Sequence, residues 1–162
     1  MRSILQLLLI GILVACNGNG TEEAIEIPAN EIAIAKEIEP FQGLGIRHDG
    51  HYKNEDRGVV YLIRFFDNGN AVLINGRSDV AEGLSQYLVK DALGDPAIGW
   101  YNVPVTVKED SIFFKTYPTK GEIEYRGNVP STSTVRLLRH SHITGTQEIK
   151  DYIFQPDNSP SQ

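Results

Sequence analysis

The chain lacks most of the features that mark an enzyme or a nucleic-acid-binding protein. Its 162 residues include one cysteine, so no intramolecular disulfide can form. There are 15 basic residues against 21 acidic ones, and the formal net charge of −6 without a basic cluster argues against nucleic acid as a partner. The sequence has no Gly-x-Ser-x-Gly elbow, phosphate loop, His-Glu-x-x-His or dinucleotide-binding motif. We therefore expect a non-enzymatic protein without a cofactor.

Long hydrophobic runs are also scarce, and the one near the start of the chain is short. Ile4 to Ala15 is apolar apart from Gln6 and Gly11, and it follows the positive charge of Arg2. A helix of this length rises about 18 Å, whereas a hydrocarbon core is about 30 Å thick. The run therefore predicts a signal peptide over residues 1–15 and not a membrane span.

The signal peptide ends in Leu13-Val14-Ala15-Cys16, which resembles the lipobox of bacterial lipoproteins. The resemblance implies that the Cys16 thiol takes a diacylglycerol, that cleavage falls just before it, and that the new amino group is acylated. Such an anchor is stable, since each buried methylene contributes about 0.8 kcal/mol. The alternatives are an uncleaved anchor or a secreted protein with an idle cysteine. We expect a lipid-anchored envelope protein, and because Asn17 is not the aspartate of inner-membrane retention, the outer membrane is favoured.

The remaining chain divides by composition into a tether, a domain and a tail. Residues 16–41 begin small, polar and acidic, and then show the helical spacing of Ile32, Ala35 and Ile38 before Pro40. This stretch predicts a tether with either a short helix or an ordered linker. Residues 42–155 predict the folded domain, and residues 156–162 predict a flexible polar tail.

Within the domain, short β-rich runs alternate with turns, and Asn68-Gly69 is a typical hairpin turn. The runs predict about eight strands, over residues 50–54, 58–66, 71–75, 98–108, 111–117, 122–129, 134–143 and 146–154. Sequential hairpins favour an all-β, up-and-down antiparallel sheet, and eight strands can close into a barrel that leaves no exposed edge.

One helix is predicted between the third and fourth strands, over residues 78–93. Ser78 or Asp79 is the expected N-cap, and Gly94-Asp95-Pro96 follows the expected end. One face of this helix would be apolar, formed by Val80, Leu84, Tyr87 and Leu88.

Several stretches of the domain resemble small bacterial lipocalin-like proteins. Gly50-His51-Tyr52 stands where lipocalins often carry Gly-x-Trp on the first strand, and residues 61–72 (YLIRFFDNGNAV) resemble the second strand of a related domain found at the C-terminal end of certain F-box proteins. The sequences IGWYNV and LRHSHITG…YIF add to the likeness. The resemblance implies a β-barrel, and it implies no reaction, because a fold does not fix a function.

The register of the last hairpin predicts which side chains face inward. A two-residue loop at Thr144-Gly145 would place Ile143 opposite Thr146. One face then carries Val135, Leu137, Arg139, Ser141, Glu148, Lys150, Tyr152 and Phe154; the other carries Leu138, His140, His142, Gln147, Ile149, Asp151 and Ile153. The first face is the more apolar, so we expect it to point inward and the histidines to point outward.

An inward Arg139 needs a partner, which can be a structural ion pair with Glu148 or an anionic group of a ligand. Arg64 alternates with apolar neighbours, so the pattern leaves its face open. A small amphipathic ligand inside the barrel would be lined by the residues Arg64, Trp100, Tyr125, Arg139, Glu148 and Tyr152.

The four histidines offer a second, metal-binding interpretation. His140 and His142 share a strand face, His48 and His51 flank the first strand, and the first and last strands of a closed barrel are neighbours. Convergence of all four, joined by Asp49 or Asp151, would suit zinc or copper. A catalytic Ser-His-Asp arrangement can also be assembled in principle from Ser141, His140 and Asp151.

Three functions remain open from the sequence. A non-enzymatic barrel that holds a small ligand is favoured. The alternatives are a filled barrel that contacts another envelope protein, and a metal-binding or enzymatic barrel. The membrane, reached through the lipid, is the expected partner in each case.

Overall fold

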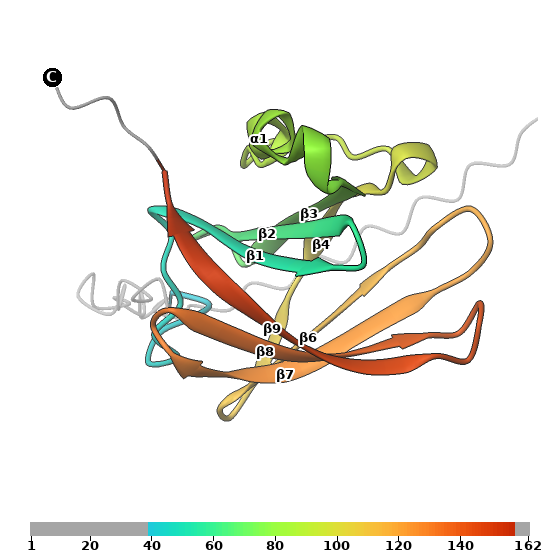
Figure 1. Cartoon of the computed structure of the whole chain (residues 1–162). Helices are drawn as coiled ribbons and strands as arrows, with labels where there is room; N and C mark the ends of the chain where they lie inside the picture. The colour runs from blue at the N-terminus through green and yellow to red at the C-terminus, as the bar shows by residue number, and fades with distance from the viewer. Residues whose placement is uncertain (1–38, 158–162) are drawn as a thin grey trace, which may run out of the picture. The chain divides into compact units, whose positions relative to one another are not determined.

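The computed structural model describes residues 39–157, in which one antiparallel sheet bends into a nearly closed barrel (Figure 1). The strands are β1 (Gly50–Asp56), β2 (Val59–Phe65), β3 (Asn70–Arg77), β4 (Trp100–Pro104), β5 (Thr106–Lys108), β6 (Ser111–Thr116), β7 (Ile123–Ser131), β8 (Thr134–Ser141) and β9 (Gln147–Pro156). Their order across the sheet is β4-β3-β2-β1-β9-β8-β7-β6-β5. The predicted all-β barrel with one inserted helix is confirmed. The signal peptide, Cys16 and most of the tether lie outside the described residues.

The sheet has nine strands where about eight were predicted, because the run over residues 98–108 is interrupted at Val105. Its first part, β4, pairs with β3, and its second part, β5, pairs with β6. The Val105 amide still donates to the Gly69 carbonyl at 2.9 Å, one residue beyond the last β3–β4 pair, and the chain then passes to β6. One bent segment therefore forms both edges of the sheet. Within residues 39–157 no ladder joins β4 to β6, and we call this gap the seam.

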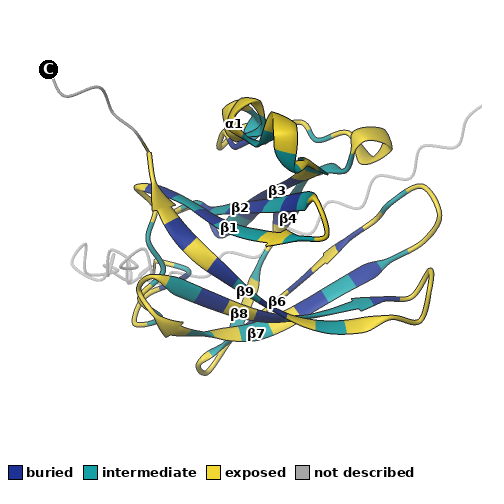
Figure 2. Ribbon diagram, in the orientation of Figure 1, coloured by how far each residue is buried: buried dark blue, intermediate teal, exposed yellow. Residues whose placement is uncertain are grey.

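Strands β2 and β3 are apolar on both faces because both faces are covered (Figure 2). Their inward residues join the barrel core, whereas Val60, Leu62, Val72 and Ile74 pack outward against Leu88 and Ala92. Burial on two sides removes the usual alternation of polar and apolar residues. In Figure 1, helix α1 (Ala81–Leu84) lies over this outer face.

The predicted helix over residues 78–93 is wrong in length and in its cap. The structure has a 3₁₀ turn at Ser78–Val80, α1, and a second 3₁₀ turn at Ser85–Tyr87. No side chain caps these turns, and the Asp79 carboxylate pairs with Arg77 at 2.7 Å instead. Gly83 within the helix disfavours a longer run. Leu88 is buried as expected, but Val80 is half exposed.

Aromatic side chains dominate the barrel core. Phe65 lies edge-on to Phe41, Tyr52 and Phe114, with ring centroids 5.5, 5.9 and 6.4 Å away. Phe41 is 5% exposed, so the folded domain begins before the predicted boundary at residue 42. Strand β9 likewise extends to Pro156, into the predicted tail. The contacts among the aromatic rings around Phe65 hold the sheet in its curved form.

The last hairpin has the predicted faces but a register shifted by two residues. His140 pairs with Gln147 and Arg139 with Glu148, and the Ser141 amide donates to the Thr146 carbonyl at 2.9 Å. The loop therefore contains residues 142–145, two more than predicted. A shift by two preserves the side-chain faces, since the strand repeats every two residues. Val135, Leu137 and Ser141 are accordingly buried.

Candidate functional site

The inward faces become polar at one end of the barrel, where the β1–β2 and β8–β9 hairpins splay apart (Figure 1). Strand β1 pairs with β9 only from Gly50 to Lys53, so the ends beyond this ladder are bridged by side chains. We call the hollow between them the polar mouth. Its lining residues are Asp56, Arg57, Val59, Tyr61, Arg139, Ser141, Thr144, Thr146 and Glu148.

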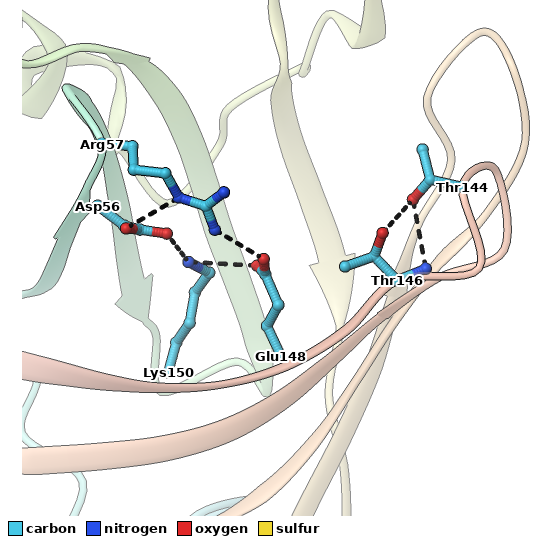
Figure 3. Close-up of polar contacts among 6 residues, drawn as sticks. All are labelled: Asp56, Arg57, Thr144, Thr146, Glu148 and Lys150. Atoms are coloured by element: carbon cyan, nitrogen blue, oxygen red, sulfur yellow. Dashed lines mark hydrogen bonds and ion pairs between the residues drawn. The ribbon is translucent and has the colours of Figure 1, made fainter.

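Four charged side chains alternate in sign across the mouth (Figure 3). Lys150 Nζ lies 2.9 Å from Asp56 Oδ2 and 3.4 Å from Glu148 Oε2. Arg57 lies over the same two carboxylates, 3.4 Å from Asp56 and 3.2 Å from Glu148. This cluster holds the two hairpins together without any backbone ladder, and its charges sum to zero.

Lys150 is the buried member of the cluster, with a side chain 6% exposed. Burial disfavours the charged ammonium, but the hydrogen bonds and charges of Asp56 and Glu148 outweigh it and raise the pKa of Lys150. The hydrogen bond from Lys150, followed by that from Arg57, lowers the pKa of Asp56. Both groups are therefore charged at neutral pH, and the cluster is an intact ionic bridge.

Arg139 stands apart from this cluster, and the predicted ion pair with Glu148 is not formed. Glu148 is shared between Arg57 and Lys150. No carboxylate among residues 39–157 forms an ion pair with the Arg139 guanidinium, and its Nε is buried without a hydrogen-bond partner. The Tyr125 hydroxyl lies beside it. Burial raises the pKa of Tyr125, and Arg139 opposes that effect. The mouth therefore carries one uncompensated positive charge.

The mouth encloses about 330 Å³, within the range of small-molecule sites. Beneath it, the space bounded by Tyr61, Leu73, Tyr101, Tyr125 and Tyr152 measures about 10 Å³, roughly the room for one water molecule. In this part of residues 39–157, a ligand of ordinary size therefore fits at the mouth and not in the space beneath it.

Four of the six residues predicted to line a ligand site lie on the inner side of the barrel. Tyr125 and Tyr152 are core residues, 7% and 1% exposed. Arg139 and Glu148 line the mouth above them. All four come from β7, β8 and β9, where the alternation of the sequence is clear.

Arg64 and Trp100 lie on the outer side of the sheet, so their predicted place in the interior is wrong. Arg64 pairs with Asp157 at 2.8 Å and donates to the His48 carbonyl. Trp100 donates from its ring nitrogen to the Tyr87 carbonyl at 3.0 Å, beneath the helical segment. The second apolar face of β2 and β3 accounts for both errors.

The four histidines do not converge. His140 pairs with Gln147 at the start of β9, whereas Gly50, beside His51, pairs with Pro156 at its end. The first and last strands are neighbours as predicted, but the length of β9, about 30 Å, separates the two histidine pairs. Asp49 and Asp151 do not join either pair, because arginines bind their carboxylates.

The triad of Ser141, His140 and Asp151 is not assembled. Ser141 is 3% exposed on the inner face, and His140 lies on the outer face, since successive residues of a strand point to opposite sides. Arg136 holds the Asp151 carboxylate with hydrogen bonds of 2.7 and 2.8 Å.

His51 gives the domain a predicted pH dependence. Burial lowers the pKa of His51; Asp157 opposes this effect, whereas Arg64 and Lys53 add to it. The unfolded chain then takes up a proton more readily than the folded one, so stability is full above the ordinary histidine value of about 6.5 and falls as the pH drops below it. We expect urea midpoints to fall between about pH 6.5 and 5, and a His51→Gln variant to lose this slope. An equal slope in both proteins would contradict the prediction.

Sequence reasoning missed the residues that complete the mouth. Asp56 and Arg57 lie beyond the predicted end of the first strand, although the alternation of Tyr52, Asn54 and Asp56 continues through it. Lys150 was placed on the inner face, but its partner Asp56 comes from β1, whose register with β9 no local pattern specifies.

No protein-family model, no curated protein and no solved structure matches the chain. Among residues 39–157, no helix has the length and apolar character needed to cross a membrane.

Proposed function

We propose that this protein is a lipid-anchored, non-enzymatic binding protein of the cell envelope, with a lipocalin-like barrel that binds a small anionic ligand at the polar mouth. The observation that carries the proposal is Arg139, which points into the mouth without a carboxylate partner among the described residues. Guanidinium groups in such surroundings form strong paired hydrogen bonds with carboxylate, sulfonate or phosphate oxygens.

The rest of the mouth suits the same class of ligand. Ser141, Thr144 and Thr146 supply hydroxyl groups, and the Tyr61 ring supplies an apolar wall. The cluster of Asp56, Arg57, Glu148 and Lys150 fixes one side of the hollow. Because its charges sum to zero, it does not compensate the positive charge of Arg139. A compact ligand with one acidic group and a small apolar body matches these features.

The proposal is tested by titrating residues 37–162, the compact unit that contains the whole sheet, with anilinonaphthalene sulfonate. This probe combines an anionic group with an apolar body and fluoresces when its surroundings become apolar. We expect saturable binding at one site, with displacement by other small anions. Fluorescence that does not saturate, or that anions do not displace, would count against the site.

A filled barrel that binds another envelope protein is the second candidate, and the seam favours it. The hollow beside the seam encloses about 430 Å³ and is lined partly by Val103, Pro104, Phe113, Phe114 and Tyr117. Unpaired strand edges next to apolar side chains can accept an added strand. Under this alternative, substitutions of residues that line the seam abolish binding of the partner protein, whereas substitution of Arg139 does not.

Cys16, which lies outside the described residues, carries the anchor in this proposal. Its support is the lipobox and the short apolar run before it. When cells that express the full chain are grown with radioactive palmitate, the protein should become labelled. A Cys16→Ala variant should not be labelled, because no other residue provides a thiol. Persistent labelling of the variant would refute lipid attachment at this position.

A further inference from the structure

A row of polar side chains crosses the outer face of the sheet, opposite the barrel core. Lys115 on β6 pairs with Glu124 on β7, and Glu124 pairs with His140 on β8. Directly paired residues of neighbouring strands have side chains on the same face, about 5 Å apart at their β-carbons. The row therefore brings a carboxylate and an imidazole together at a position that the strands fix.

His142 joins the row from the loop after β8. Its amide donates to the Glu122 carbonyl at 3.0 Å, which ties this end of the loop to the start of β7. Its ring lies 4.1 Å from the ring of His140, and its Nε2 lies 3.4 Å from Glu124 Oε2. Two imidazoles and one carboxylate thus face one another.

The spacing matches that of metal ligands. One ligand atom from each of Glu124, His140 and His142 lies within 4.8 Å of the other two. Tetrahedral ligands about 2.1 Å from a zinc ion stand about 3.4 Å apart, so the His142 to Glu124 distance already fits. The ligand nitrogen of His140 lies within 4.8 Å of both.

We propose that Glu124, His140 and His142 bind a divalent transition-metal ion, Zn²⁺ above all, on the outer face of the barrel. Imidazole nitrogens select zinc and its neighbours over Ca²⁺ and Mg²⁺, which prefer oxygen ligands. Three protein ligands leave a fourth position for water. Glu122, with Oε1 3.8 Å from His142 Nε2, is a further side chain that can occupy this fourth position.

Lys115 prepares the carboxylate for this role. Its Nζ lies 2.8 Å from Glu124 Oε1 and 2.9 Å from Glu122 Oε1, which leaves Glu124 Oε2 directed at His142. The hydrogen bond from Lys115 lowers the pKa of Glu124, and that from His142 lowers it further, so the carboxylate is ionised at neutral pH. The ammonium also repels a cation, and His142 is 43% exposed, so we expect weaker binding than in a closed structural zinc site.

Calorimetric titration of the full chain, purified in detergent without a histidine tag, tests the site with Zn²⁺ alone. We expect one ion per chain, and at least about tenfold weaker binding in His140→Ala, His142→Ala and Glu124→Gln, since even the loss of a partner outside the first ligand sphere costs that much.

His51→Ala is the matched control, because it removes a histidine of β1 that pairs with Gln155, near the far end of β9 from the site, and should leave the affinity unchanged. The replaced side chains lie on the outer face, and circular dichroism checks that each variant is folded. A second readout is thermal: Zn²⁺ should raise the unfolding temperature of the wild type and of His51→Ala, but not of a His140→Ala/His142→Ala double variant. Wild-type protein without zinc binding, or a double variant that binds as tightly as the wild type, would overturn the proposal.

Discussion

Replacing Phe65 by alanine should lower the free energy of unfolding by about 3–5 kcal/mol, the usual cost of removing a large aromatic side chain from a core. The Phe65 side chain is 0% exposed and makes edge-on contacts with the rings of Phe41, Tyr52 and Phe114. Since small domains are stable by only about 5–15 kcal/mol, the variant should be close to unfolding at 37 °C. Urea unfolding followed by circular dichroism measures the loss.

The control is the same substitution on the other side of the sheet. Phe113→Ala removes a ring that is 37% exposed on the outer face of β6, and we expect a change within about 1 kcal/mol. Similar losses for Phe65→Ala and Phe113→Ala would contradict the assignment of inner and outer faces.

Replacing Arg139 by glutamine should weaken binding of anilinonaphthalene sulfonate about tenfold to a hundredfold, since hydrogen bonds to charged groups contribute about 1.5–3 kcal/mol. The same substitution should leave the free energy of unfolding unchanged or raise it. Arg139 makes no ion pair with residues 39–157 and has a buried Nε without a partner, so its removal leaves the ion pairs of the cluster intact. Fluorescence titration and urea unfolding measure the two effects.

Arg136→Gln is the matched control for this experiment. Arg136 lies on the same strand but faces outward, where Asp151 binds it through two hydrogen bonds. Its removal should leave probe binding unchanged. If Arg139→Gln destabilises the domain and Arg136→Gln does not, Arg139 is structural. If both variants bind the probe as the wild type does, the mouth is not the site.

The fold was predictable from the sequence wherever local patterns decide it. Short runs with turns between them predict sequential hairpins, and the faces of the last hairpin were right even though its loop is two residues longer than predicted. Only an odd shift exchanges the faces of a strand. The helical segment was less predictable, because Gly83 shortens it and packing against β2 and β3 holds it in place.

The site was predictable only in part, because it depends on contacts between distant strands. Arg139 and Glu148 followed from alternation within β8 and β9. The absence of an ion pair between them did not follow, since Lys150 on β9 and Arg57 both bind Glu148, and Arg57 reaches it only through the pairing of β1 with β9. The proposed metal ligands show the same limit: His140 and His142 are two residues apart in the sequence, but their carboxylate partner Glu124 comes from the neighbouring strand.

Native mass spectrometry of the full chain, released from membranes in detergent, tests the central claim most directly. Wild-type protein and the Arg136→Gln variant should carry the added mass of one small acidic molecule, and the Arg139→Gln variant should carry none. A wild-type chain without any added mass, or an Arg139→Gln chain that retains it, would contradict an anion-binding site at the polar mouth.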